Sequence, residues 1–190
     1  MLGHLLYGDA RALMDARLRW AIGVALGGIA ATVISLWVPQ REVHHALTVN
    51  VFDCRAAEEG ARVCVASGRL SVGNTGNVDL SEVRVHFPAE AAEWRISTRV
   101  FDIRASAKTR ARPVFSMQRE AGAQVYSIRP LAENTVVDFE CQCLRCAEEA
   151  VRALTAERIR IDSAGRVAKG DPRVTTVARG LVSLLAALVP

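Results

Sequence analysis

The residues with the clearest capacity for chemistry are the five cysteines of the chain. Cys141, Cys143 and Cys146 form a C-x-C-x-x-C cluster, which can supply three thiolates to zinc or to an iron–sulfur centre. A fourth ligand is not evident nearby, and on a β-strand Cys141 and Cys143 would share one face as small core residues. A redox pair is a further alternative, although no C-x-x-C opens a helix after a strand of a βαβ unit.

The other two cysteines, Cys54 and Cys64, flank a loop between two predicted strands. A disulfide across this hairpin is the simplest pairing, and closing a loop of about ten residues contributes about 2–3 kcal/mol. An odd number of cysteines outside the cytoplasm leaves at least one thiol unpaired or shared with another chain. We predict the Cys54–Cys64 bond and leave the pairing of the other three open.

The histidines and charges give no support to catalysis. The histidines are His4, His44, His45 and His86, and none falls near a nucleophilic serine or a carboxylate in a triad-like context. The adjacent pair His44 and His45 is expected to be solvated linker, because neighbouring side chains on an extended chain point oppositely. The net charge is +4 without a block of like charges. We predict that the protein is not an enzyme, holds no cofactor and binds no nucleic acid.

The five cysteines all follow a long apolar stretch, from Trp20 to Val38, that contains no ionisable side chain. As an α-helix it would be about 28 Å long, close to the thickness of the hydrocarbon core of a bilayer. Trp20 and Trp37 would lie in the two headgroup layers, and Pro39 would end the helix. The alternative is a signal peptide, but the preceding segment is long and no clear A-x-A cleavage site follows. We predict one uncleaved transmembrane helix over residues 20–39.

The arginines around this stretch predict its orientation. Arg17 and Arg19 lie just before it, together with Arg11, whereas only Arg41 follows closely. The positive-inside rule then places residues 1–19, an amphipathic segment, in the cytoplasm and the rest of the chain outside it.

Small residues recur every four positions within the stretch, at Gly23, Gly27 and Ala31. They would line one helix face and let another helix approach closely. The predicted partners are therefore the lipid bilayer and other membrane-protein subunits, or a second copy of the chain, through this helix. Gly and Ala are also common in any membrane helix, so a face without a partner is the alternative.

Beyond Arg41 the apolar period changes from helical to two, which is typical of half-buried β-strands. Leu47, Val49 and Val51 alternate with polar residues in this way. Seven to nine short strands are predicted in all, within residues 47–51, 62–66, 69–72, 83–87, 93–103, 113–117, 124–128, 135–143 and 158–161. Their spacing predicts a mainly β fold, an antiparallel β-sandwich over residues 47–172 after a linker at 40–46, with a short helical insertion near 146–155.

The connection after Leu70 contains Gly73, Asn74, Gly76 and Asn77 between two strands, where residues that tolerate positive φ are expected. Here the sequence resembles bacterial immunoglobulin-like domains of the cell-adhesion-related (CARDB-like) kind, which have a similar N-x-G-N connection followed by an alternating strand. The segment 128–139 is similar to a later part of those domains, where a Pro-Leu turn precedes an extended strand. The resemblance implies an immunoglobulin-like binding or spacer module without catalytic residues.

The end of the chain, residues 173–190, carries apolar residues at helical spacing, with Arg179 as the only charge from residue 174 onward. Arg179 is unfavourable at the centre of a bilayer, and the charge-free remainder is too short to cross it. An interfacial or docking helix is therefore predicted rather than a second span. Its apolar residues are Val177, Leu181, Leu184, Leu185 and Leu188.

Taken together, the sequence predicts a single-pass protein of the bacterial inner membrane that displays an immunoglobulin-like domain in the periplasm. Its function would be that of a non-catalytic accessory, scaffold or binding subunit of a membrane assembly. One alternative is a signalling or defence effector with a cytoplasmic ligand-sensing β domain, which predicts reduced cysteines. The other is a metal or redox protein that uses Cys141, Cys143 and Cys146.

Overall fold

A computed structural model describes residues 20–24, 39–57, 61–102, 112–120 and 123–188. The chain divides into two compact units, which are treated separately. One unit is Pro39–Gly180 and holds the β domain, and the other is Met1–Val38 with Leu181–Pro190. In the second unit, residues 20–24 are helical. The rest of the predicted transmembrane helix lies outside the described residues.

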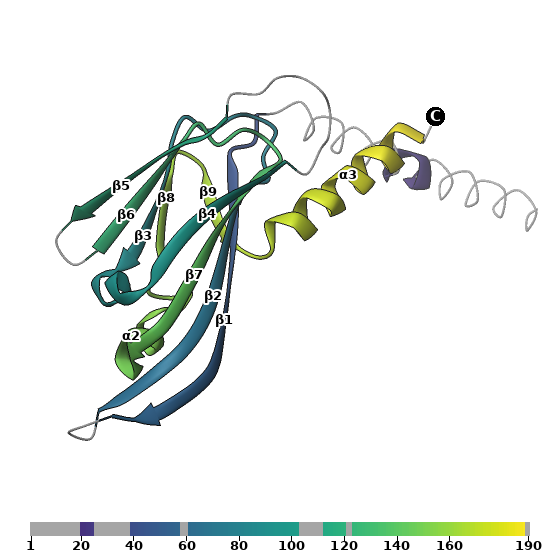
Figure 1. Cartoon of the computed structure of the whole chain (residues 1–190). Coiled ribbons are helices and arrows are strands. Elements are labelled where there is room, and N and C mark those ends of the chain that lie inside the picture. The colour runs from purple at the N-terminus through teal and green to yellow at the C-terminus, as the bar shows by residue number, and fades with distance from the viewer. Residues whose placement is uncertain (1–19, 25–38, 58–60, 103–111, 121–122, 189–190) are drawn as a thin grey trace, which may run out of the picture. The chain divides into compact units, whose positions relative to one another are not determined.

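The β domain has two antiparallel layers, apart from one parallel pair (Figure 1). The five-stranded sheet has the order β4-β7-β2-β1-β9 and the four-stranded sheet the order β5-β6-β3-β8. The elements are β1 (Glu42–Ala56), β2 (Arg62–Asn74), β3 (Val83–Pro88), the 3-10 helix η2 (Ala89–Glu93), β4 (Arg95–Asp102), β5 (Val114–Glu120), β6 (Ala123–Arg129), β7 (Thr135–Ala147), α2 (Glu148–Ala153), β8 (Arg160–Ser163), β9 (Arg166–Lys169) and α3 (Pro172–Leu188).

The core lies between the two sheets and follows from the alternation in the strands. On β3, Val83, Val85 and Phe87 are fully buried while the residues between them reach the surface. Side chains from β2 and β7 meet them from the other sheet, because every second residue of a strand points to the same face. Phe87, Tyr126 and Phe139 pack edge to face around one point, with ring centroids 5.5–5.6 Å apart. The mainly β, two-sheet architecture predicted from the sequence is thus confirmed.

Three features differ from the sequence-based expectations. β2 runs without a break through the region where two strands were expected, and it pairs with β1 along almost its whole length. β1 begins at Glu42, so residues 42–46 are strand and the predicted linker at 40–46 is wrong there. The short strand β9 was not expected, and it pairs in parallel with the beginning of β1.

The two histidines of that supposed linker belong to the β domain. His45 is buried and burial lowers its pKa, while His44 Nδ1 lies 2.8 Å from Thr75 Oγ1. The expectation of solvated linker residues is therefore wrong. Alternation does hold, because the two side chains point to opposite faces of β1, but both faces at this end of the strand are covered.

Gly76, which follows β2, is required for a different reason from the one expected, and Gly165 is required for the same reason as Gly76. Among the residues that the structure describes, positive φ occurs at Asn134 and Gly170 and not in the Gly73–Asn77 connection. At Gly76 a Cβ atom would lie 2.0 Å from the Gln40 carbonyl oxygen. Gly165, in the turn between β8 and β9, would place a Cβ atom 2.4 Å from the Arg41 carbonyl oxygen. Close approach of two backbones, and not a left-handed turn, therefore excludes side chains at both positions.

Candidate functional site

The first residues of the β domain are fixed between the two glycine turns. Gln40 donates its N–H to Asn77 Oδ1 at 2.6 Å, and its carbonyl oxygen accepts from Asn77 N at 3.1 Å. The Arg41 carbonyl oxygen accepts from Arg166 N at 2.9 Å, on the other side. The chain is therefore hydrogen-bonded into the β domain from Gln40, two residues after Val38, the last residue of the apolar stretch.

The last helix, α3, starts at a sequence signal for helix initiation. Asp171 precedes Pro172, and its Oδ1 accepts a hydrogen bond from Arg173 N at 2.9 Å. This is the side-chain cap expected at an N-cap aspartate, and a proline at the first helical position costs no hydrogen bond. The helix that the sequence predicted at the end of the chain is present, and its first residue is fixed by this cap.

A buried carboxylate holds the first turn of α3 against the five-stranded sheet. Asp138 on β7 is 1% exposed, and its Oδ2 accepts from Arg173 Nη2 at 2.6 Å. Ser71 Oγ on β2 donates to Asp138 Oδ1 at 2.8 Å, and Arg69 Nε lies 3.8 Å from Oδ2. The Arg173 guanidinium also stacks over the Phe101 ring, 5.0 Å from its centroid. Sequence reasoning missed this cluster, although an aspartate inside an apolar strand is a signal for a buried partner.

A second arginine of α3 reaches the beginning of the β domain. Arg179 donates to the carboxylate of Glu42, the first residue of β1, and to the carbonyl oxygen of Thr75. The charge that argued against a membrane span is thus used in an ion pair within the β domain. This contact places the turn of α3 that contains Arg179 beside Glu42, close to the point where the chain enters the β domain.

The opposite side of α3 is apolar and exposed. Pro172 and Thr176 are buried against the sheet, whereas the residues facing away are Val174 (67% exposed), Val177 (55%), Leu181 (59%) and Val182 (54%). The predicted docking residues Val177 and Leu181 therefore form an uncovered apolar stripe. The side chains of Leu184, Leu185 and Leu188, the other three of that set, lie outside the described residues.

The predicted membrane-helix residues are largely beyond what the structure describes. Trp20 is exposed, and a Cβ atom at Gly23 would meet nothing within 4 Å. Within the described ranges, no helix is both long and apolar enough to cross a membrane. The remaining residues of these predictions lie outside those ranges: Arg17, Arg19, Gly27, Ala31 and Trp37.

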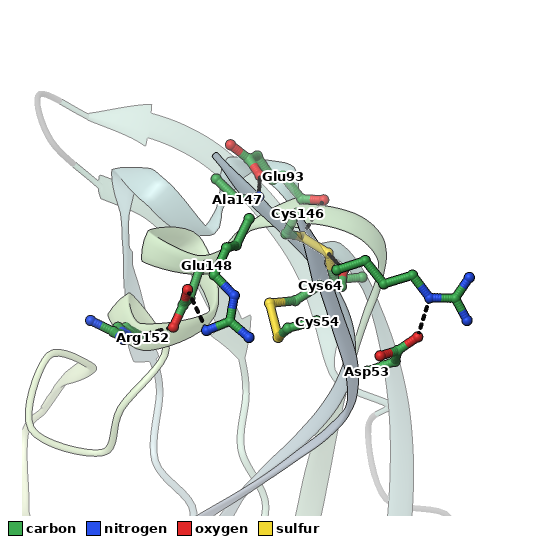
Figure 2. Close-up of a disulfide and its surroundings, with 11 residues drawn as sticks. Asp53, Cys54, Cys64, Glu93, Cys146, Ala147, Glu148 and Arg152 are labelled. Carbon is green, nitrogen blue, oxygen red and sulfur yellow. Dashed lines mark hydrogen bonds and ion pairs between the residues drawn. A yellow bond between two sulfur atoms is a disulfide. The ribbon is translucent and has the colours of Figure 1, made fainter. Parts of the chain in front are cut away.

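Four of the five cysteines form disulfides. The predicted Cys54–Cys64 bond is confirmed, and it joins directly opposed residues of β1 and β2. A second bond joins Cys143 and Cys146 at the end of β7. Figure 2 shows Cys54, Cys64 and Cys146 gathered at one place in the five-stranded sheet, close to α2. Glu93 Oε2 accepts from Ala147 N at 2.9 Å and fixes the end of β7 beside the second bond.

The remaining cysteine, Cys141, carries a free and buried thiol. Cys141 and Cys143 are both buried core residues, as the alternative to a metal site proposed. In this oxidised form Cys143 and Cys146 do not offer thiolates, and in the part of the chain that is described no three His, Cys, Asp or Glu side chains are arranged to hold a metal ion. Metal binding by Cys141, Cys143 and Cys146 stays a prediction that concerns the reduced protein only.

Cys141 is expected to resist alkylation by iodoacetamide at pH 8 as long as the β domain is folded. Burial raises the pKa of its thiol to about 12, so the reactive thiolate is almost absent at that pH. Mass spectrometry of the non-reduced protein checks this result: denaturant should expose one alkylation site per chain, at Cys141. Modification at another cysteine under the same conditions would show that the disulfides are assigned wrongly.

Comparisons with known proteins identify no family. No family model matches the sequence, and no curated protein matches it. Among solved structures, the chain is similar to the chitin-binding domain of chitinase from Pyrococcus furiosus, with a TM-score of 0.28 and 12% sequence identity, covering 65% of this chain and 97% of that chain. That likeness is too low to carry an argument about function. The CARDB-like resemblance remains a prediction from short sequence motifs.

Proposed function

We propose that this chain is a non-catalytic, membrane-attached binding subunit of a bacterial inner-membrane assembly, with its immunoglobulin-like domain held close to the outer surface of that membrane. The observation that carries the proposal is the ion pair between Arg179 and Glu42. It brings α3 to the same point at which the chain enters the β domain from the apolar segment 20–38.

The number of residues between Val38 and Glu42 limits how far this ion pair can lie from the membrane. Val38 ends the apolar segment, and the four residues from there to Glu42 span at most about 14 Å when fully extended. Arg179 therefore lies within a few residues' reach of the bilayer surface if segment 20–38 crosses it. The exposed stripe of Val177 and Leu181 would then lie on the bilayer, which is the surface best able to cover apolar side chains at that place.

Rigidity at the domain's first residues supports the same function. Gln40 and Arg41 are clamped by the Gly76 and Gly165 turns, so the backbone is bound to the β domain from Gln40 onward. A domain held this way presents a fixed surface to other subunits. The small-residue face of Gly23, Gly27 and Ala31 would supply the contact with a neighbouring membrane helix.

The two disulfides support a location outside the cytoplasm. Bonds of this kind persist in oxidising compartments such as the bacterial periplasm and are rare in the reducing cytoplasm. The alternative of a cytoplasmic ligand-sensing domain predicts reduced cysteines, so the disulfides Cys54–Cys64 and Cys143–Cys146 favour the periplasmic orientation.

Tryptophan quenching in vesicles tests the placement of α3. The full-length Leu181→Trp variant, reconstituted in vesicles of brominated phosphatidylcholine, is expected to show quenching of the added fluorescence, because bromine quenches indoles that reach the acyl chains. Val114→Trp is the matched control, since Val114 is exposed on β5 and far in sequence from both apolar segments. The wild-type signal is subtracted in both cases.

Equal and weak quenching of the two added tryptophans would contradict bilayer contact and leave a protein partner as the cover of the stripe. Protease added to spheroplasts that express the full chain tests the orientation separately. Digestion of the β domain from outside is the expected result. Protection in spheroplasts, together with digestion in inverted vesicles, would favour the cytoplasmic alternative instead.

A further inference from the structure

The two disulfides lie so close together that one cysteine has a choice of partners. Cys64 on β2 is directly opposite Cys54 on β1 and also directly opposite Cys146 on β7. Directly opposed residues of antiparallel strands have Cα atoms about 4.5–5.5 Å apart, which is within the range that a disulfide spans. Their side chains also point to the same face of the sheet. The bond Cys64–Cys146 is therefore compatible with the backbone as it stands.

The other member of the second disulfide lies in the same cluster. Cys143 Sγ is 3.9 Å from the Cys64 carbonyl oxygen, so the Cys143–Cys146 bond lies against the residue that would attack it. Only Cys54 reaches the surface, since Cys64, Cys143 and Cys146 are buried at 0–2% exposure. Cys54, which is half-buried, is therefore the one of these four cysteines that a thiol in solution can approach in the folded protein.

We propose that these four cysteines form a thiol–disulfide exchange site that accepts electrons from a dithiol donor at Cys54 and passes them to the buried Cys143–Cys146 bond. The inference rests on the strand register and on burial, and it does not depend on membrane attachment. It differs from a C-x-x-C redox pair acting alone, because the partly exposed cysteine, Cys54, belongs to the other disulfide.

The exchange balances in three steps. One thiolate of the donor attacks Cys54 Sγ, forms a mixed disulfide and releases Cys64 as a thiolate. The Cys64 thiolate attacks Cys146 Sγ, so that the Cys64–Cys146 bond forms and Cys143 leaves as a thiolate, which takes up a proton. The second thiol of the donor then attacks the donor's own sulfur atom in the mixed disulfide. This closes the donor disulfide and releases Cys54 as a thiolate, which takes up a proton. The donor is oxidised to a disulfide by two electrons, and the protein retains one disulfide and gains two thiols.

Substoichiometric reduction of the full-length protein tests the exchange. One equivalent of dithiothreitol is added, thiols are trapped with N-ethylmaleimide in an acidic, denaturing quench, and the linked peptides are mapped without further reduction. The expected result is alkylation at Cys54 and Cys143, in addition to the free Cys141, and a Cys64–Cys146 linkage. Alkylation at Cys54, Cys64 and Cys141 with an intact Cys143–Cys146 bond would overturn the proposal, because that is simple reduction of the Cys54–Cys64 disulfide.

A cysteine variant provides a second test of the exchange that needs no added reductant. Cys143→Ser leaves Cys146 as a thiol beside the Cys54–Cys64 bond, and most chains should then contain Cys64–Cys146 with Cys54 open to alkylation. Cys141→Ser is the matched control, because Cys141 is on the same strand but opposite Gly68; its wild-type disulfides should persist. Far-ultraviolet circular dichroism confirms that each variant is folded. Retention of Cys54–Cys64 in the folded Cys143→Ser variant would also overturn the proposal.

Discussion

Phe139→Ala is expected to lower the free energy of unfolding of the β domain by about 3–5 kcal/mol, the usual cost of truncating a fully buried phenylalanine. Phe139 is 0% exposed on β7 and meets Phe87 and Tyr126 edge to face. These rings come from both sheets, so removal of the Phe139 ring leaves a cavity between the layers. The lost aromatic pairs add about 0.5–1.5 kcal/mol each within that range. Urea denaturation followed by circular dichroism, with the disulfides intact, measures the change.

Phe52→Ala is the matched control for this substitution. Phe52 lies on β1, where the β1–β2 register shifts, and its side chain is 68% exposed. The same atoms are removed without opening a cavity, so the free energy of unfolding should change by no more than about 0.5 kcal/mol. Similar losses for both variants would show that the inter-sheet contacts assigned to Phe139 are wrong.

Arg173→Ala is expected to have the second largest effect, a loss of about 2–3 kcal/mol in the free energy of unfolding. It leaves Asp138 buried with its charge supported by Ser71 and by the more distant Arg69. Breaking a fully buried pair costs about 3–5 kcal/mol, and the lower figure here reflects the partial access of water to Arg173. Faster hydrogen exchange at the Thr176 and Val177 amides should accompany the loss, because the first turn of α3 is no longer tied to Asp138.

Two further variants show whether this effect is electrostatic. Asp138→Asn in the Arg173→Ala background removes the unpaired charge and should recover about 1–2 kcal/mol. Arg152→Ala breaks the exposed pair with Glu148, whose nitrogen and oxygen atoms are 2.6 Å apart, and should change stability by less than about 0.5 kcal/mol. If Arg173→Ala has an effect as small as Arg152→Ala, α3 is not held by Asp138.

The sequence-based predictions succeeded for features that depend on residues close together in the sequence. The alternation Val83, Val85 and Phe87 predicted a strand and its buried face correctly, because a period of two reflects only the backbone and the side of the sheet. The Cys54–Cys64 bond followed from a hairpin of short sequence separation. The helical spacing of apolar residues over 173–190 likewise predicted a helix from local sequence, and α3 spans Pro172–Leu188.

Predictions failed where residues distant in sequence meet. The sequence predicts a linker at residues 40–46, yet β9 pairs with residues 42–45 from more than a hundred residues away. Gly76 was attributed to a turn of positive φ, whereas the reason for a glycine is the backbone at Gln40. The contact between Asp138 and Arg173 joins a strand to a helix that no local pattern relates.

By itself, then, the sequence determined the mainly β character of the domain, the face that each clear strand buries and the presence of the last helix. These properties depend on the order of polar and apolar side chains over a few residues. Only the tertiary structure decided the order of strands in the two sheets, the pairing of Cys143 with Cys146 and the meeting of Arg179 with Glu42. Such contacts depend on how the layers pack, because packing brings together backbone and charges that are far apart along the chain.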